Sequence, residues 1–515
     1  MSEIADKTLE LWKSIKIHIE NQNLDEALEI LDEIISNKIE IEPQYFKIQL
    51  VDAYVHIADV MAVSKEAIPK AEKVILKSIG LLKKYKSLLN DDNDLRLLYD
   101  SIYARSLQIS HKINNQLKAI ERGEERFDFT KIENIYDIKE TIQNSIVLYR
   151  DCVNRSSTKE KIYANRNNLA ISLSRVGRFV ESMINYEENI RLIKDRPESN
   201  LSWADNLFNM KKQFNLMNCA SIYYCIAERY IAGINSDELS DRIKNKIYHY
   251  IIEIESQLNQ IGFELSDEKI EQNREEELAD IQEHPELRKF SFEHQITLSE
   301  HALFCNCRDS REDNLEIGNL NPNDEQTLAT IISEFAFARY LLFKYMHNLI
   351  DEPDDFKKTS ANNSVIGYRI EHLKQSFKIV YSILDKIGNG ILDSLNITRI
   401  ARHTYFEDIF GHYSEKLAPI NNISLCALYS LSLELNRSNG NLKYFKKLRN
   451  IMEHETKLNI VSEEEIEFSE EDKVISSMAM KDLTLNLMKL TRSAIFSFVF
   501  LLREMTPARA ESSNL

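Results

Sequence analysis

The chain has 515 residues and a net charge of −17, because 65 lysines and arginines stand against 82 aspartates and glutamates. This acidic balance argues against a protein that coats nucleic acid through a wide basic surface, although it leaves room for a local basic site. There are only 11 glycines and 8 prolines. So few turn-forming residues predict long helices with short connections, and therefore an all-α fold.

The six cysteines are scattered, and no two of them form a CxxC pair, so neither a zinc module nor a disulfide framework is predicted. No group of histidines and carboxylates has the spacing of metal ligands, and we expect no metal and no cofactor. The first residues are polar and lack the apolar core of a signal peptide. The longest apolar run, residues 494–502, is too short to span a bilayer. These features predict a cytoplasmic protein that does not enter a membrane.

The clearest local pattern of the N-terminal half spans residues 168–187. Its apolar residues fit two helices, and Gly177 permits a tight turn between them. Ala170 and Ser182 are small residues that would let the two helices approach closely, and Tyr186 continues the second helix. This order of small, large and glycine positions resembles a tetratricopeptide repeat (TPR).

Similar but looser units lie at residues 24–31 and 53–79, and their irregular spacing indicates degenerate repeats. Residues 1–289 are therefore predicted to form a TPR-like α-solenoid. Such an array commonly holds a protein partner on its concave face. Because a repeat fold sets a shape and no ligand, the array could equally be a scaffold that only packs against its own C-terminal domain.

Residues 290–323 are predicted to connect the repeats to a C-terminal domain. The strongly charged stretch 266–289 marks the end of the repeats. Residues 298–307 then supply one apolar anchor, and the polar stretch 308–323 follows it. We expect this connector to dock on the next domain.

The C-terminal domain is predicted over residues 324–505, with a tail at 506–515. The sequence 321–324 (Asn-Pro-Asn-Asp) is a helix start signal, and Gly388-Asn389-Gly390 is expected to end the second helix as a C-cap. Helices are expected at about residues 326–350, 365–387, 424–435, 442–454 and 474–504, with an irregular segment at 391–422 and an acidic loop at 462–472.

The helix expected over residues 442–454 carries two side chains suited to phosphodiester cleavage. The Arg449 guanidinium can bind phosphate oxygens through a planar fork of donors. The His454 imidazole can move a proton near neutral pH. On RNA the 2′-hydroxyl is the nucleophile, so this pair needs no metal.

Taken alone, the same stretch also fits an ordinary amphipathic helix. Its apolar residues recur every three or four positions and share one face. A solvated basic face on the other side would explain the lysines without any function. The apolar residues are Leu442, Phe445, Leu448 and Met452, and the lysines are Lys443, Lys446 and Lys447.

A wider pattern resembles the HEPN domain (higher eukaryotes and prokaryotes nucleotide-binding). The order is an apolar helix at 425–435, the Arg-Asn-x-x-x-His motif within 447–454, and Thr-Arg-Ser-Ala-Ile at 491–495. It is similar to a prokaryotic HEPN branch that follows TPR-like repeats, and the segment 303–306 is similar to the connector of that branch. The resemblance covers residues 290–505, and it covers the repeats by class only.

The resemblance implies a metal-independent endoribonuclease that acts as a homodimer on an RNA substrate. Arg449 would bind the scissile phosphate and stabilise the charge of the transition state. His454 would act as general base toward the 2′-hydroxyl or as acid toward the leaving oxygen. Asn450 would orient one of them or contact the phosphate. The expected products are a 2′,3′-cyclic phosphate and a 5′-hydroxyl.

Weaker candidates surround this motif. A basic rim for RNA would come from four lysines: Lys443, Lys446, Lys447 and Lys457. Glu334, inside the first helix, is a candidate to orient Arg449. Arg492, among apolar residues of the last helix, is a candidate to pair with Glu334.

Helix geometry gives a reason for a dimer. Five residues at about 100° each place Arg449 and His454 roughly 140° apart on an ideal helix. Two helices that meet at a symmetry axis, or a helix that frays before His454, would bring the two groups to one phosphate. HEPN toxins controlled by a nucleotidyltransferase carry a tyrosine two residues after the histidine, where this chain has Thr456. Control by nucleotide attachment is therefore not expected.

Two functions from different classes remain open. One is a ribonuclease effector whose repeat array senses a trigger or a protein partner, in antiphage defence, as a toxin or in a stress response. The other is a non-catalytic HEPN/TPR adaptor for proteins or nucleotides. The Arg449/His454 pair favours the first, while the acidic balance and the lack of a wide basic surface favour the second.

Overall fold

The computed structural model describes most of the chain, in two compact units that are treated separately below. The first unit comprises residues 1–132 and 136–176, and the second comprises residues 133–135 and 177–515. The residues outside the description are 1–12, 16, 20, 37–43, 90–91, 125–133, 195, 215, 217–218, 235–240, 281–284, 306–307, 316–319, 351–366, 401–404, 437, 439, 455–457, 462–467, 470–472 and 506–515.

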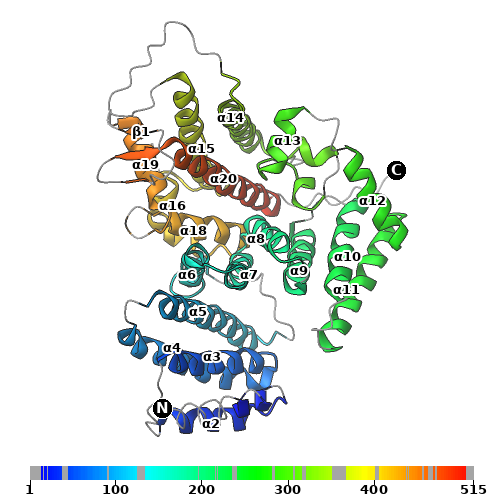
Figure 1. Ribbon diagram of the computed structural model, residues 1–515. Coiled ribbons are helices and arrows are strands. Elements are labelled where there is room, and N and C mark those ends of the chain that lie inside the picture. Colours follow the sequence, from blue (N-terminus) through cyan, green and yellow to red (C-terminus); the bar gives the residue numbers. More distant parts are fainter. Residues whose placement is uncertain are drawn as a thin grey trace. The chain divides into compact units, whose positions relative to one another are not determined.

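The first unit is a stack of helices in which each helix packs on its neighbours in the chain. Figure 1 shows α3 and α4 side by side, α5 above them, and α6 and α7 side by side above α5. Asp92 caps the longest of them, since its side chain accepts hydrogen bonds from the amides of Asp94 and Leu95. This arrangement fits the predicted α-solenoid. The helices are α2 (Leu24–Ser36), α3 (Gln44–Met61), α4 (Ile68–Tyr85), α5 (Asn93–Glu121), α6 (Ile142–Arg155) and α7 (Lys159–Arg175), with short 3₁₀ turns at Lys65–Ala67, Lys86–Leu88 and Ile135–Ile138.

The second unit begins with further helices of the predicted array. Gly177 precedes them with a φ of 81°, which confirms the predicted turn. A Cβ at this position would lie 2.5 Å from the Ile423 carbonyl oxygen, so the glycine also permits a close approach to a helix of the C-terminal bundle. The helices are α8 (Phe179–Leu192), α9 (Pro197–Phe214), α10 (Ala220–Ile234), α11 (Asp241–Gln260), α12 (Asp267–Asp280) and α13 (Glu286–Glu293).

The connector that follows α13 is held by polar contacts as well as by its predicted apolar anchor. Leu303 and Phe304 are buried, as expected. Arg339 donates to the Ile296 carbonyl at 2.9 Å, and Arg492 donates to the Thr297 carbonyl at 2.7 Å. The connector includes 3₁₀ turns at His301–Leu303 and Arg308–Arg311.

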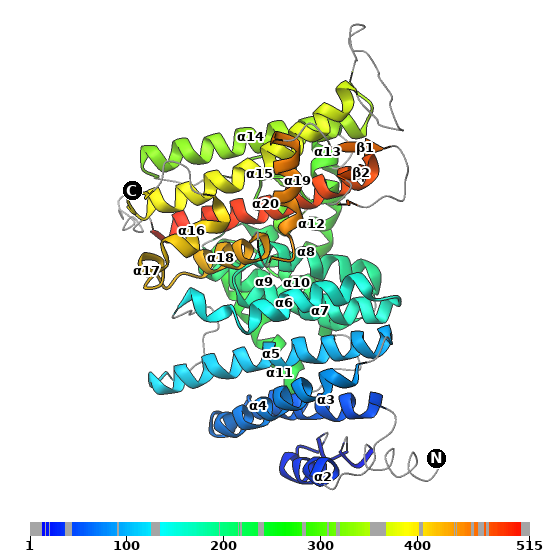
Figure 2. The ribbon, with the colours of Figure 1, turned by 90° about the vertical axis from the view of Figure 1, so that its left-hand side faces the viewer.

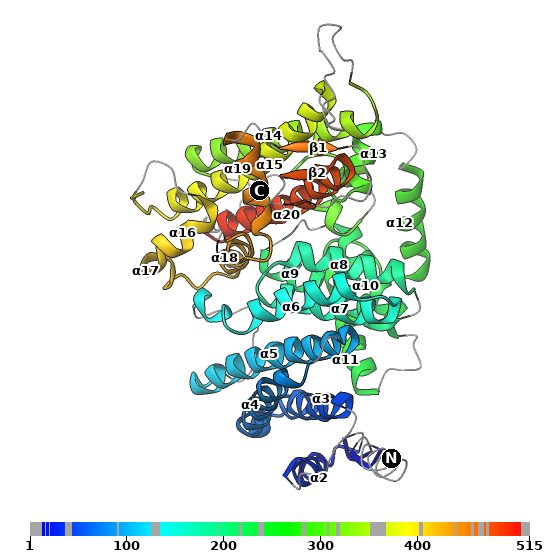
Figure 3. The ribbon, with the colours of Figure 1, turned by 60° about the vertical axis from the view of Figure 1, so that its left-hand side comes forward.

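The C-terminal part is an all-α bundle with one small pair of parallel strands. Figure 2 shows α14, α15 and α20 running side by side, which agrees with their extensive mutual packing. Figure 3 shows the two strands beside α19 and the start of α20. The elements are α14 (Pro322–Met346), α15 (Tyr368–Ser394), α16 (Phe406–His412), α17 (Ser414–Leu417), α18 (Ile423–Leu435), α19 (Lys443–His454), β1 (Asn459–Val461), β2 (Val474–Ser476) and α20 (Ser477–Met505).

Helix ends were predicted with mixed success. Asn321 caps α14 as expected, accepting hydrogen bonds from the amides of Asn323 and Asp324. The predicted end of the second helix at 387 is wrong, because α15 continues to Ser394. Gly388 and Gly390 lie inside it, where an added Cβ would come within 2.3 Å of Ile409 and 2.7 Å of Phe498, respectively. These glycines serve close packing, so the C-cap interpretation is corrected.

Two other segments of the bundle differ from prediction. The supposedly irregular stretch 391–422 contains the short helices α16 and α17. The last helix begins at Ser477 and not at 474, because residues 474–476 pair with β1. The predicted domains 1–289, 290–323 and 324–505 and the tail at 506–515 stay predictions.

The last helix, α20, has the length and the apolar composition of a membrane-spanning helix. Ser477–Met505 is long and apolar enough to cross a bilayer, but 83% of its most apolar window is buried inside the fold. It packs against α14, α15 and α18. Burial on several sides is what the central helix of a soluble bundle requires, so its apolar character is explained by the core.

Candidate active site on α19

Helix α19 places the motif residues, and its bounds agree with the prediction for residues 442–454. Phe445, Leu448 and Ile451 are buried and fix the helix against its neighbours. These neighbours are α15 and α18. The motif arginine and histidine therefore sit in the last two turns of a helix whose rotation is set by the core.

Arg449 is mostly enclosed but only partly paired. Its side chain is 16% exposed, and Nη1 lies 3.0 Å from Glu453 Oε2. The same nitrogen donates to Asn450 Oδ1 at 3.1 Å. Arg449 Nε is buried and makes no hydrogen bond to any described residue. An enclosed guanidinium with an unused donor has capacity for an additional oxygen ligand.

His454 lies at the exposed end of the same helix. Its side chain is 71% exposed, and Nε2 lies 3.8 Å from Glu453 Oε2. The carboxylate oxygen that Arg449 contacts therefore also faces His454. Although the two positions are roughly 140° apart on an ideal helix, both side chains come within 4 Å of one atom.

Glu453 was missed by the sequence reasoning. The signal was present, because Glu453 follows Arg449 by four residues and immediately precedes His454. Opposite charges four residues apart on a helix are neighbours. The site is thus a triad of Arg449, Glu453 and His454, with Asn450 as a second acceptor for the arginine.

One of the three lysines, Lys446, belongs neither to the predicted basic rim nor to a solvated face. Lys446 is buried, in an ion pair with Glu407 of α16, and its ammonium lies 4.5 Å from the centre of the Tyr405 ring. Burial lowers the pKa of Lys446, while nearby Asp385 opposes that shift. The expectation that Lys446 is solvated is wrong, because its partner Glu407 comes from a helix that was not predicted. Lys443 and Lys447 are half-buried.

A second layer of titratable groups lies behind α19. Burial raises the pKa of Asp385, while the Phe406 amide, Arg449 and Lys446 act in the opposite direction. Asp385 Oδ1 accepts from the Phe406 amide at 2.9 Å. Burial also raises the pKa of Tyr381. The Asp385 carboxylate therefore lies near both Lys446 and Arg449, and Arg449 Nε makes no hydrogen bond to it.

The two predicted supporting residues lie elsewhere. Glu334 forms an ion pair with Lys386, so it is not placed to orient Arg449. Arg492 is buried and donates to the connector at Thr297, and burial lowers its pKa to about 10. The suggested pairing of Arg492 with Glu334 is therefore corrected: Arg492 holds the connector.

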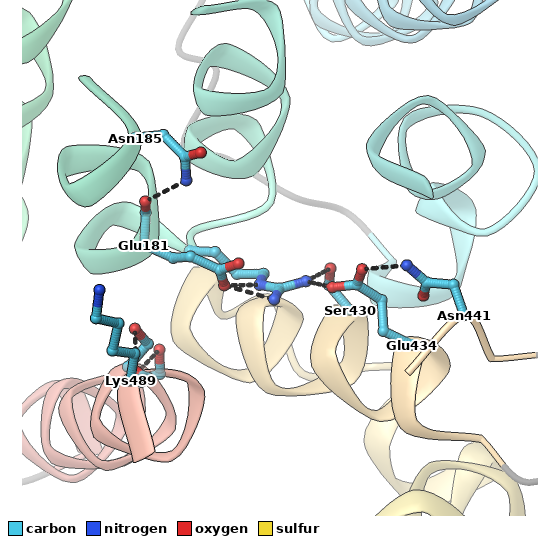
Figure 4. Close-up of polar contacts among 9 residues, drawn as sticks. Glu181, Asn185, Ser430, Glu434, Asn441 and Lys489 are labelled. Atoms are coloured by element: carbon cyan, nitrogen blue, oxygen red, sulfur yellow. Dashed lines mark hydrogen bonds and ion pairs between the residues drawn. The ribbon is translucent and has the colours of Figure 1, made fainter. Parts of the chain in front are cut away.

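The start of α19 is fixed by a buried network that the sequence did not reveal (Figure 4). Arg178, before α8, forms ion pairs with Glu434 of α18 and with Glu181. Asn441 Nδ2 donates to Glu434 Oε1 at 3.2 Å, and the Leu442 amide donates to the Glu434 carbonyl at 2.8 Å. One carboxylate thus connects the first helix of the unit to the turn that starts the motif helix.

Within the described part of the chain, no group of three or more His, Cys, Asp or Glu side chains is placed to hold a metal ion. Thr456 and Lys457 lie outside the described residues.

Comparison with known proteins agrees with this helical bundle. Residues 318–505 match the family model described as LA2681-like HEPN. This part of the chain is a HEPN domain, and it follows a helical region that fits a solenoid. Searches of curated proteins and of solved structures gave no match.

Proposed function

We propose that this protein is a metal-independent endoribonuclease that acts as a HEPN dimer, with Arg449 and His454 as its catalytic residues. The observation that carries the proposal is their approach to one carboxylate oxygen, at 3.0 and 3.8 Å. A phosphate oxygen has similar size and charge to the oxygen of Glu453, so the same two groups can converge on a scissile phosphate.

The chemistry follows from the two side chains. Arg449, with Nε unused, binds the phosphate and stabilises the added charge of the pentacovalent transition state. His454, exposed at the helix end, takes the proton of the 2′-hydroxyl or gives a proton to the 5′ oxygen that leaves. The P–O5′ bond breaks as the 2′ oxygen bonds to phosphorus, which gives a 2′,3′-cyclic phosphate and a 5′-hydroxyl. Asn450 orients Arg449.

A dimer is proposed because the motif of one protomer supplies one imidazole, that of His454, for two proton transfers. A second α19 across a two-fold axis would supply the other acid or base. The repeat array is proposed to sense a trigger or a protein partner, in antiphage defence, as a toxin or in a stress response. Lys443 and Lys447 are proposed to contact the RNA backbone, and the protein is proposed to be cytoplasmic.

The test is cleavage of a mixed RNA pool in the presence of EDTA. Wild type should cut and leave cyclic-phosphate ends, whereas His454→Ala should not. The matched control is His412→Ala, which removes an exposed histidine of α16 and should cut like wild type. Cleavage by His454→Ala at the wild-type rate would overturn the assignment. Sedimentation of the same samples measures the oligomeric state.

A non-catalytic adaptor is the second candidate. Lys446 is removed from the surface by its pairing with Glu407, and the chain is acidic, so electrostatic attraction for RNA is limited. A folded dimer that binds a protein on its repeats and cuts no RNA in any state would support this alternative.

A further inference from the structure

A separate polar cavity lies within the second unit, between helices of the repeat region and the connector. Its volume is about 360 Å³, which is in the range of small-molecule sites. Helices α8, α9 and α10 form one wall, and α13 with the connector forms the other. None of the residues of the α19 triad lines it.

Hydrogen-bond donors gather on the helical wall. Trp203 is 2% exposed and lines the cavity, and its indole Nε1 makes no hydrogen bond to any described residue. A buried N–H group gains stability when an acceptor reaches it, so this indole can bind an oxygen atom of a ligand. The Arg229 guanidinium stacks over the Trp203 ring at 5.2 Å. Arg191, with a side chain 69% exposed, adds a second guanidinium.

Acceptors are present in the same cavity. Glu187 keeps 25% of its side chain exposed, although burial raises its pKa, as expected for a carboxylate deep in a cavity. Arg191 is 3.8 Å from it and does not form a close pair. Glu293 is the second carboxylate of the lining. A carboxylate in this environment gains from a cation placed beside it.

A hydrogen bond from Gln295 fixes the position of the Glu187 side chain. Gln295 follows α13 with a φ of 57°, a left-handed conformation that glycine adopts at much lower cost. The Ile296 amide donates to the Ser291 carbonyl at 2.8 Å in this helix-ending turn. A glutamine at such a position has a use for its side chain, and Gln295 Nε2 donates to Glu187 Oε2 at 2.5 Å.

We infer that this cavity binds a free α-amino acid with an apolar side chain. The ligand carboxylate would be held by Arg191, Arg229 and the Trp203 indole, and its ammonium group by Glu187 and Glu293. The apolar part of the lining would receive the ligand side chain: Ile190, Phe292, Ala302 and Phe304. This site goes beyond the proposed function, and its occupation does not depend on ribonuclease activity.

The charge balance of the lining selects this ligand class over others. Two guanidiniums and two carboxylates leave no net charge for a phosphate group, and the carboxylates would repel its double charge. A simple amine would bring no acceptor to the Trp203 indole, and a simple carboxylate would bring no cation to Glu187 beyond its hydrogen bond from Gln295. A zwitterion satisfies both sets.

The experiment is calorimetric titration of the full chain with apolar L-amino acids, namely phenylalanine, leucine and tryptophan. Three probes test which charged groups of the ligand are recognised. 3-Phenylpropionate lacks the ammonium group, phenethylamine lacks the carboxylate, and inorganic phosphate lacks both. At least one amino acid should bind saturably, and each probe should bind at least tenfold more weakly, the loss expected for one charged hydrogen-bonding group.

Arg191→Gln is the informative variant, because this exposed side chain contributes little to folding. It should weaken amino-acid binding at least tenfold. The matched control Arg196→Gln makes the same charge change outside the cavity, at an exposed arginine near Glu198, and should bind like wild type. Absence of saturable binding by all three amino acids would overturn the inference. Equal binding of a probe, or unchanged binding by Arg191→Gln, would overturn it as well.

Discussion

Arg178 and Arg449 lie in the same compact unit, yet their surroundings differ in one decisive respect. Arg178 is buried between two carboxylates: Nε and Nη2 donate to Glu181, and Nη1 donates to Glu434. Arg449 is enclosed too, but it has one carboxylate contact through a single nitrogen, and Nε is unused. The Arg178 guanidinium is fully engaged in ion pairs within the fold, whereas the Arg449 guanidinium still has a donor that can bind a ligand.

The number of unused guanidinium donors distinguishes a structural arginine from a candidate catalytic one. Burial does not, because both side chains are enclosed. A buried guanidinium with every donor satisfied has nothing to offer a substrate, and its removal leaves buried carboxylates without a partner. A guanidinium with an unused donor beside an exposed imidazole can exchange its present contacts for those of a phosphate. The variants below test whether the two arginines respond in these opposite ways.

The largest effect on stability is expected from Arg178→Met. It leaves Glu434 buried without its cation, and breaking such a pair lowers the free energy of unfolding by about 3–5 kcal/mol. Urea unfolding of the full chain measures it. The double variant Arg178→Met/Glu434→Gln should recover part of the loss, since it removes the uncompensated charge. A loss in the single variant below about 1 kcal/mol would show that the pair does not stabilise the fold.

Arg449→Ala should have the opposite profile. Loss of one donor group for transition-state charge typically lowers kcat by about 10²–10³-fold. Stability should change far less than in Arg178→Met, because the hydrogen bond and the ion pair of Arg449 both lie on its own helix. Single-turnover RNA cleavage and urea unfolding of the same preparation measure both quantities. Full activity together with a large loss of stability would assign Arg449 to the fold and contradict the comparison.

Glu453→Gln tests whether the present partner of Arg449 competes with RNA. Its carboxylate faces both Arg449 and His454, so removing the charge should favour a phosphate there. An exposed charge interaction of about 0.2–1 kcal/mol corresponds to a roughly 1.4- to fivefold lower Kd for RNA. Binding is measured in a His454→Ala background, which prevents cleavage. A higher Kd would mean that Glu453 is needed to position Arg449.

The contrast between the two arginines also shows what the sequence could reveal. The bounds of α19 were predictable because its apolar residues repeat at helical spacing, and Arg449 and His454 belong to a recognisable motif. The Arg178 network was not predictable, since its members are 256 residues apart in the chain. Lys446 was misjudged for the same reason, because Glu407 comes from a distant short helix.

Other errors came from residues with two possible uses. Gly388 and Gly390 carry the composition of a helix end, but their lack of a side chain serves close packing against Ile409 and Phe498. Composition cannot distinguish these uses, because the neighbours that fill the space are set by tertiary packing. Glu453 was the one missed site residue with a purely local signal, its four-residue spacing from Arg449.

The smallest effect on stability is expected from Arg399→Gln. This variant tests whether the loss expected in Arg178→Met comes from the number of carboxylate contacts or from their burial. Arg399 contacts the Asp393 carboxylate through two nitrogens, so it is well partnered, but both side chains remain accessible to water. Water replaces the lost contacts on both sides, and the free energy of unfolding should fall by about 0–1 kcal/mol. Urea unfolding under the same conditions as for Arg178→Met measures it.

A loss as large as that of Arg178→Met would mean that the number of contacts alone sets how much an arginine contributes to the free energy of unfolding. A small loss would mean that Arg178 stabilises the fold because water cannot reach its carboxylates and replace it. By the same reasoning Arg449, which is partly exposed, can exchange its present contacts for those of a phosphate.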